Sequence, residues 1–272
     1  MPLRLIHLTD IHFGSEDTAA VTAAAEFVRA TPFDLLVATG DMTQWGRHEE
    51  FAAAKAWLAS LPGPQIATPG NHDTPWFGLF ERVTAPFERY RRAIGPTETT
   101  RLIPGLAVST VNSARGWQVR WNWSKGAVSR PQIARAIRHL RPATPDRVRI
   151  VVCHHPLVEI PGEPITSRVR GGARAARTLA SAGVDLVVSG HLHKPFVYAL
   201  PFGDGLTYAI GAGTLSLRAR GAPPGFNIIE IDGQRLSVVT MAWTGQRLEV
   251  ERSWEVPLRP RPSVPGGAHA AL

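Results

Sequence analysis

The first half of the chain alternates short apolar runs with longer segments of helical periodicity. Apolar runs of strand length predict buried strands, and segments with apolar residues every three to four positions predict amphipathic helices. The predicted strands are Leu3–Leu8, Asp34–Ala38, Gln65–Ala67, Leu106–Val111, Arg147–Cys153 and Val184–Ser189. The predicted helices are Asp17–Arg29, Glu49–Leu61, Thr84–Ile94, Pro131–Leu140 and Ala173–Ser181. This alternation is typical of mostly parallel strands joined by helical crossovers.

After Ser189 the helical segments stop and strand-like segments follow one another directly. The further predicted strands are Pro195–Leu200, Leu206–Ile210, Phe226–Ile231, Leu236–Trp243 and Leu248–Val256. Strands without crossover helices are expected to be largely antiparallel. Two sheets packed face to face, with helices outside, accommodate both halves in one domain of the α/β class. We expect this domain to span residues 1–256, and the Pro/Gly-rich segment 257–272 to be a disordered tail.

Composition restricts the class of protein further. The chain has 272 residues, of which 44% are hydrophobic and 19% charged, and this excludes general disorder. The net charge is +8, and only three of the 30 basic residues are lysines. Arginine suits phosphate ligands, although for any single arginine a place on a solvated basic surface is the more common explanation. Cys153 is the only cysteine, and the N-terminus carries no apolar stretch of signal-peptide length. We therefore expect a cytoplasmic protein without membrane association.

Five short polar segments follow apolar runs along the chain. In open α/β sheets ligands bind outside the carboxyl ends of the strands, so these segments are expected to meet at one edge. Extended backbone sends alternate residues to the same side, so each Asp-x-His or His-x-His pair can present two ligands together. Each segment alone also occurs as an ordinary turn, but the combination points to a shared site. The segments are Asp10-Ile11-His12, Gly40-Asp41, Gly70-Asn71-His72-Asp73, His154-His155-Pro156 and Gly190-His191-Leu192-His193.

The side chains in these segments are of metal-ligating types. Imidazole and carboxylate together suit first-row divalent metals, and manganese, iron, zinc and cobalt all stay open. Seven ligands are too many for one tetrahedral ion, and they fit two ions that share a carboxylate. Two ions about 3.5–4 Å apart favour in-line attack of a metal-bound hydroxide at phosphorus. The candidate ligands are Asp10, His12, Asp41, Asn71, His154, His191 and His193.

These segments resemble those of the calcineurin-like metallophosphoesterase superfamily. Gly40-Asp41-Met42-Thr43, Val151–Leu157 and Val184–His193 are similar to its cyclic-nucleotide phosphodiesterase branch. The resemblance implies a four-layer αββα sandwich of two mixed sheets flanked by helices. It implies one metal held by Asp10, His12, Asp41 and His193, and a second held by Asp41, Asn71, His154 and His191.

The resemblance also implies that His72 is the acid that protonates the leaving oxygen. Arg115, which follows a predicted strand, is a weaker candidate for contact with the substrate phosphate. Two departures from the family patterns narrow the chemistry. Gln44 stands where purple acid phosphatases have a tyrosine ligand, so no ferric–tyrosinate colour is expected. Asn71-His72-Asp73 differs from the Asn-His-Glu of protein serine/threonine phosphatases, which argues against a protein substrate.

The leading hypothesis is a dinuclear hydrolase of a small-molecule phosphodiester or phosphomonoester, with a 3′,5′-cyclic nucleotide among the candidates. A DNA-processing nuclease is an alternative that the charge of +8 favours, but the chain lacks an extra DNA-capping region. A metal-free scaffold is a second alternative, which the complete set of ligands disfavours. We expect a small phosphate ester as partner rather than nucleic acid, and leave a homodimer open. Cys153 is predicted to pack in the core, and Trp117, Trp121 and Trp123 lie in a predicted loop or hairpin.

Overall fold

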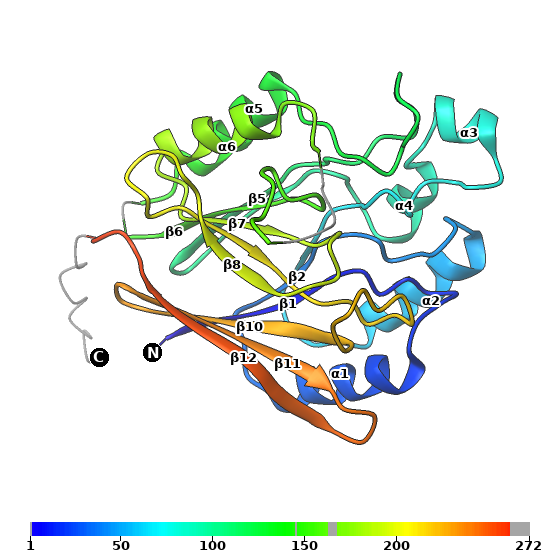
Figure 1. Ribbon diagram of the computed structural model, residues 1–272, viewed down its shortest axis with the longest axis horizontal. Coiled ribbons are helices and arrows are strands. Elements are labelled where there is room, and N and C mark those ends of the chain that lie inside the picture. Colours follow the sequence, from blue (N-terminus) through cyan, green and yellow to red (C-terminus); the bar gives the residue numbers. More distant parts are fainter. Residues whose placement is uncertain (1, 145, 163–167, 262–272) are drawn as a thin grey trace, which may run out of the picture.

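The computed structural model describes residues 2–144, 146–162 and 168–261, which form two six-stranded sheets flanked by helices (Figure 1). The first sheet has the order β12 (Leu248–Pro257), β11 (Arg235–Trp243), β10 (Gly225–Asp232), β1 (Leu3–Leu8), β2 (Leu35–Ala38), β3 (Gln65–Ala67). The second has the order β4 (Thr100–Ile103), β5 (Leu106–Thr110), β6 (Val148–Val152), β7 (Leu186–Ser189), β9 (Tyr208–Gly211), β8 (Phe196–Ala199). The helices are α1 (Thr18–Ala30), α2 (His48–Ala59), α3 (Leu79–Thr84), α4 (Glu88–Ala93), α5 (Arg130–Leu140) and α6 (Gly172–Ser181).

Both sheets are mixed, as predicted. In the first sheet β1, β2 and β3 run parallel, and β10, β11 and β12 add an antiparallel meander. In the second sheet β5, β6, β7 and β9 run parallel, while β4 and β8 are antiparallel edge strands. The parallel strands at the centre of each sheet therefore place their carboxyl ends at a common edge.

Three apolar layers hold the predicted αββα sandwich together. Leu5 and Val37 of the first sheet pack against Val108 and Ile150 of the second, and form the core between the sheets. Residues that alternate with these, such as Ile6, face outward and pack under α1 and α2. A third cluster joins the outer face of the second sheet to α5 and α6 (Figure 1). Because both faces of these strands are covered, their sequences read as continuous apolar runs.

The structure corrects two predicted elements. The helix predicted for Thr84–Ile94 is shorter in the structure. Thr84 is the last residue of the separate helix α3, and α4 begins only at Glu88, because Pro86 lacks the N–H that a continuous helix needs. Strand β4 was not predicted, since it lies at a sheet edge and its two middle residues are exposed. The segment Trp117–Trp123 is a loop, with no hairpin strands.

The beginning of the predicted tail is also ordered. Pro257 is the last residue of β12, and Leu258 is buried in the core between the sheets. Arg259 and Arg261 both form ion pairs with Asp185, beside β7 of the other sheet. Proline content suggested a tail here, but a buried leucine and a paired carboxylate fix the segment as far as Arg261. Residues 262–272 of that prediction lie outside the described residues.

Candidate metal centre

All five polar segments lie at the carboxyl ends of parallel strands. Asp10 and His12 follow β1, Asp41 follows β2, and Asn71 lies beyond β3 in the first sheet. In the second sheet His154 lies after β6, and the His191–His193 pair follows β7. Each of the seven predicted ligands is at most 5% exposed. The structure therefore brings the predicted ligands of both sheets to one buried place.

The backbone is strained at these positions. Six non-glycine residues among those described have a positive φ, and five of the six are predicted ligands. A left-handed conformation costs a residue with a side chain about 1–2 kcal/mol. Strain of this kind gathers at functional sites, where the surrounding structure has to hold it. The five are Asp10 (φ 52°), His12 (φ 52°), Asp41 (φ 51°), His191 (φ 69°) and His193 (φ 61°).

Glycines allow the neighbouring loops to approach these ligands. A Cβ added at Gly70 would collide with the carboxylate of Asp41, and one added at Gly190 would collide with Thr9 and Asp10. Glycine at these two positions therefore serves close packing around the carboxylates.

The two carboxylates are anchored in the same way. Oδ2 of Asp10 accepts hydrogen bonds from the hydroxyl of Thr9 (2.7 Å) and the backbone N–H of His191 (2.8 Å). Oδ1 of Asp41 accepts from the backbone N–H of His72 (2.8 Å). In each case the second carboxylate oxygen faces imidazole nitrogens. Oδ1 of Asp10 lies 3.0 Å from Nε2 of His193, and Oδ2 of Asp41 lies 3.3 Å from Nε2 of His154.

Backbone carbonyls determine which imidazole nitrogen carries the proton. Nδ1 of His154 lies 2.7 Å from the carbonyl oxygen of Thr39, and Nδ1 of His193 lies 2.8 Å from that of Arg218. A carbonyl oxygen only accepts, so Nδ1 donates in both residues. In the neutral ring Nε2 then carries no proton and offers its lone pair. Hydrogen bonds of this type orient metal-ligating histidines in many proteins.

The result is a set of imidazole nitrogens and side-chain oxygens that face one another. Nε2 of His154 faces the carboxylate of Asp41 and lies 3.2 Å from Oδ1 of Asn71. Nε2 of His12 and Nε2 of His193 lie 3.3 Å apart. Such an arrangement needs positive charge between the facing atoms. Protons or metal cations supply it, and the donor set matches the nitrogen and oxygen ligands of first-row divalent metals.

The pKa directions agree with a site built for cations. Burial opposes ionisation of Asp10, yet the charge of His193 and hydrogen bonds from His12 and His193 hold its pKa well below the usual range. Burial alone would lower the pKa of His154, but the carboxylates of Asp41 and Asp10 raise it to about 9. Without a metal ion His154 therefore carries a proton, which a bound cation would displace.

Asp10 and Asp41 each belong to more than one group of potential ligands. One group consists of Asp10, His12 and His193, and another combines Asp10, Asp41 and His154. Oδ2 of Asp41 lies 3.7 Å from Nε2 of His12 and 3.3 Å from Nε2 of His154. This oxygen therefore lies between the two sets of imidazoles.

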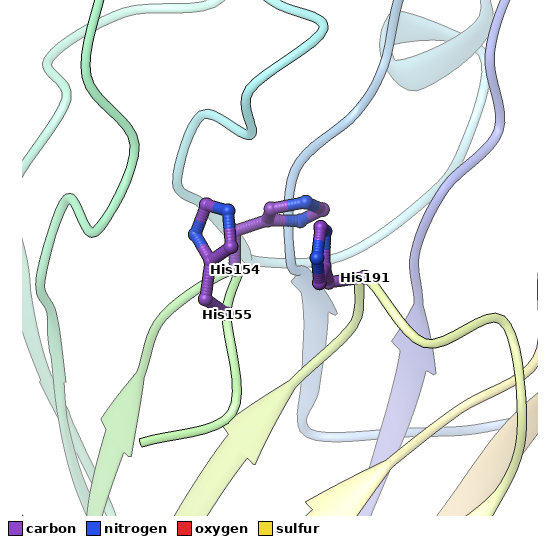
Figure 2. Close-up of side chains that lie close together, drawn as sticks. All are labelled: His154, His155 and His191. Carbon is purple, nitrogen blue, oxygen red and sulfur yellow. The ribbon is translucent and has the colours of Figure 1, made fainter. Parts of the chain in front are cut away.

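His155 lies close to the cluster but has no nitrogen left for a metal ion. Figure 2 shows its ring beside those of His154 and His191, with centroids 4.7 Å and 4.5 Å away. Nε2 of His155 donates to the carbonyl oxygen of Ser124 (2.8 Å), and its Nδ1 accepts from the hydroxyl of Ser113 (2.9 Å). Burial and the charge of His154 lower the pKa of His155 to about 3. His155 thus packs against the ligands as a neutral ring.

His72 lies at the edge of the cluster, within reach of a positive side chain. Its Nδ1 donates to the carbonyl oxygen of Gln44 (2.7 Å), and its Nε2 accepts from Nη1 of Arg218 (2.8 Å). Nη1 of Arg218 also lies 3.4 Å from the side-chain oxygen of Gln44. Burial lowers the pKa of His72, and the charge of Arg218 adds to this effect while that of Asp41 opposes it.

Arg115 points elsewhere. Its guanidinium donates to the carbonyl oxygens of Asn112 (2.8 Å) and Ala114 (2.6 Å), and to Oε1 of Gln132 in α5 (2.8 Å). These contacts direct Arg115 toward the helical layer, so the prediction that it contacts phosphate gains no support from this geometry.

Three residues that the sequence did not single out complete the surroundings of the site. Arg218 contacts His72, and Nη1 of Arg220 donates to the carbonyl oxygen of His191 (2.8 Å). The buried carboxylate of Asp73 accepts from Gly70 and Thr43, and so joins the loops after β2 and β3. Asp73 belongs to the Gly70-Asn71-His72-Asp73 segment, but nothing in the sequence assigned it a partner.

Comparison with known proteins identifies the family. A family model described as calcineurin-like phosphoesterase matches residues 3–195, which include all seven predicted ligands. The chain belongs to the calcineurin-like phosphoesterase family. This family is metal-dependent, and the clusters described above could hold metal ions. The chain is a phosphoric ester hydrolase.

Two curated relatives of this phosphoesterase are named as phosphodiesterases. A probable cyclic nucleotide phosphodiesterase of Synechococcus sp. is 26% identical over 255 residues, 85% of this chain and 89% of that protein. A glycerophosphodiester phosphodiesterase of Enterobacter lignolyticus is 33% identical over 81 residues, 25% of this chain and 29% of that protein.

Solved structures share the fold at low sequence identity. A purple acid phosphatase from yellow lupin (Lupinus luteus) matches with a TM-score of 0.69 and 13% identity, over 95% of this chain. The phosphoesterase spans about half of that chain, 54%. The Plasmodium protein GAP50, an anchor in the inner membrane complex, matches with a TM-score of 0.61 and 15% identity, over 96% of this chain and 90% of that one. In the part of the chain that the structure describes, no helix has the length and apolar character of a membrane span.

Proposed function

We propose that this phosphoesterase is a dinuclear enzyme that hydrolyses small-molecule phosphodiesters, with 3′,5′-cyclic nucleotides as the first candidates. The observation that carries the proposal is the position of Asp41, whose Oδ2 lies between Nε2 of His12 and Nε2 of His154. A carboxylate oxygen with imidazole nitrogens on two sides suits a ligand shared by two cations. The proposed domain extends past the predicted boundary at residue 256 to include the segment as far as Arg261. The cytoplasmic location and the homodimer stay predictions.

Seven side chains would hold the two ions. When bound, the ions would polarise a phosphoryl oxygen and lower the pKa of bound water to about 7. The protein orients the ligands through the carbonyls of Thr39 and Arg218, which keep Nδ1 protonated and Nε2 free. The proposed set is Asp10, His12, Asp41 and His193 for one ion, and Asp41, Asn71, His154 and His191 for the other.

Manganese, iron, zinc and cobalt stay equivalent candidates for both positions. Nitrogen and carboxylate ligands suit all four metals.

We assign His72 the role of proton donor to the leaving oxygen. Its Nδ1 is fixed on Gln44, so Nε2, which accepts from Arg218, is the nitrogen that would deliver the proton. Arg218, which donates to this Nε2, and Arg220, which donates to the carbonyl of His191, bring positive charge to the same side of the site. Positive charge there favours an anionic phosphate ester over a neutral substrate.

The preference for a diester rests on the relatives. Both are named as phosphodiesterases, one for cyclic nucleotides and one for glycerophosphodiesters. A panel should therefore compare cyclic nucleotides, glycerophosphodiesters, nucleotide-sugar pyrophosphates and monoesters, each with the four metals. The highest kcat/KM for a monoester would overturn the proposal of a diesterase.

Replacement of Asp41 tests the shared ligand. Asp41→Ala should lower kcat/KM by more than about 100-fold, beyond the usual effect of replacing a residue outside the ligand sphere. Elemental analysis should show a loss of bound metal at the same time. Asp232→Ala, at the exposed end of β10, is the matched control and should keep both metal and activity. Near-normal turnover with two bound ions in Asp41→Ala would exclude the bridging role.

The two alternative functions, a DNA-processing nuclease and a metal-free scaffold, predict different outcomes with the same purified protein. A nuclease should bind DNA with an affinity that falls steeply as salt rises. A metal-free scaffold should contain no bound metal when it is purified without a chelator, and should hydrolyse no member of the panel.

A further inference from the structure

A cavity of about 820 Å³ lies between α5 and α6, on the outer face of the second sheet. Figure 1 shows these two helices side by side in the outer helical layer. The floor of the cavity is aliphatic, with Val128, Ile133 and Ala175 buried beneath it. None of the proposed metal ligands is among the described residues that line it. The cavity is therefore separate from the phosphoesterase site.

Arginines dominate the rim of this cavity. No aspartate or glutamate is among the described lining residues, so the positive charge is not balanced locally. Arg135, on another face of α5, forms an ion pair with Glu98. The six lining arginines, by contrast, form no ion pair within the described chain. They are Arg115, Arg130, Arg138, Arg141, Arg170 and Arg174.

The positive charge is greatest where the two helices begin. The N–H of Val128 donates to the carbonyl oxygen of Arg170 (2.9 Å), which places the starts of α5 and α6 side by side. Arg130, Arg170 and Arg174 lie at this end. No side chain caps α6 at Gly171, so its first backbone N–H groups add to the potential that favours an anion. From there the aliphatic floor follows α5 for about 16 Å, the rise between Arg130 and Arg141.

We propose that this cavity binds an anionic amphiphile, with a phosphate or carboxylate head and an alkyl chain. The head would lie between Arg130, Arg170 and Arg174, since guanidinium forks match both anions. The chain would lie on Ile133 and its aliphatic neighbours. A nucleotide fits less well, because the lining contains no aromatic side chain on which a base could stack. The site does not depend on the proposed phosphodiesterase activity.

Calorimetric titration of the metal-loaded protein with dodecylphosphonate tests the proposal, because the C–P bond resists hydrolysis at the active site. We expect one molecule to bind per chain. Arg174→Gln should weaken binding by more than about tenfold, while Arg177→Gln is the matched control. Arg177 lies on the same helix but stacks on Phe202, away from the described lining of the cavity.

A second variant separates the cavity from the metal centre. Ala134 is exposed and lines the cavity, so Ala134→Trp should fill it and abolish binding without loss of phosphoesterase activity. Binding that survives in Ala134→Trp would place the ligand at the metal centre and overturn the proposal.

Three other probes examine the chemistry of the ligand. If methylphosphonate bound as tightly as dodecylphosphonate, the alkyl chain would contribute nothing and the cavity would be an anion site only. If dodecyl maltoside bound as tightly as dodecylphosphonate, the arginines would have no role in recognising the ligand. An acidic amphipathic helical peptide that displaces dodecylphosphonate at a lower concentration would show a protein-binding groove instead. Each of these three results overturns the proposal.

Discussion

Replacement of Arg218 by methionine tests how the surroundings of His72 set its chemistry. Nδ1 of His72 donates to the carbonyl of Gln44, and Nε2 accepts from Nη1 of Arg218 at 2.8 Å, so the ring is held neutral. Burial lowers the pKa of His72, and the charge of Arg218 lowers it further. A general acid works only while protonated, so kcat/KM should fall as pH rises through this pKa.

The size of the effect follows from the distance between the two groups. Two unit charges 4 Å apart interact by about 1 kcal/mol in water and about 4 kcal/mol at an effective dielectric constant of 20. One pKa unit corresponds to about 1.36 kcal/mol. Because Arg218 is only half-buried, the true value lies toward the aqueous limit. Loss of its charge should therefore raise the pKa of His72 by about one unit.

The sign of the shift in activity follows directly. A higher pKa keeps His72 protonated to a higher pH, so the alkaline limb of kcat/KM should move upward by about one unit in Arg218→Met. Gln44→Asp should move the limb in the same direction, since it places a carboxylate where the amide oxygen now lies 3.4 Å from Nη1 of Arg218. Both variants keep the backbone carbonyl of residue 218 that orients His193, so metal content should not change.

The assay needs two substrates with different leaving groups. An alkyl phosphodiester requires a proton on its leaving oxygen, whereas 4-nitrophenolate departs without one, so only the alkyl ester should show the shift. An unmoved limb with the alkyl ester would refute either the control of His72 by Arg218 or the role of His72 as the acid. A shift with both substrates would assign the limb to another titrating group.

Two further predictions concern residues outside the reaction. Iodoacetamide at pH 8 should leave the activity intact, because Cys153 is buried and its thiol lies 3.3 Å from the carbonyl oxygen of His155. Burial also raises the pKa of this thiol to about 12, so little reactive thiolate forms. Rapid inactivation that substrate prevents would contradict this prediction. Arg259→Ala should lower the free energy of unfolding by about 2–4 kcal/mol in urea denaturation, because it removes the ion pairs with Asp185 and Asp204. The control Arg247→Ala removes an exposed ion pair and should change the free energy of unfolding by less than about 0.5 kcal/mol. A loss below about 1 kcal/mol for Arg259→Ala would show that the end of the chain does not join the sheets.

The sandwich was predictable because its central strands are covered on both faces. Leu5 points into the core between the sheets and Ile6 points to the helices, so β1 reads as an unbroken apolar run. Edge strand β4 has exposed residues at its centre and gives no such signal. The polar segments were recognisable for the same reason, because each ligand follows a run that is plainly a strand.

Contacts between distant segments could not be predicted from local patterns. Arg218 meets His72 across 146 positions of the chain, in a sequence where arginine is common and therefore uninformative. Arg115 also shows how little its position alone reveals. Its place after a strand suggested contact with phosphate, whereas its guanidinium donates to the carbonyls of Asn112 and Ala114 nearby, and contact with phosphate stays a prediction.

The neighbouring histidines His154 and His155 show where sequence reasoning reaches its limit. Both follow β6, both are buried, and the family pattern alone distinguished them. In the structure the difference lies in the partner of the second nitrogen. His154 donates from Nδ1 to Thr39 of the opposite sheet, which leaves Nε2 for a metal ion. His155 uses both nitrogens, on Ser113 and Ser124, within its own sheet and loop. A ligand role therefore depends on how the two sheets pack, because the carbonyl that selects the tautomer of His154 belongs to the other sheet.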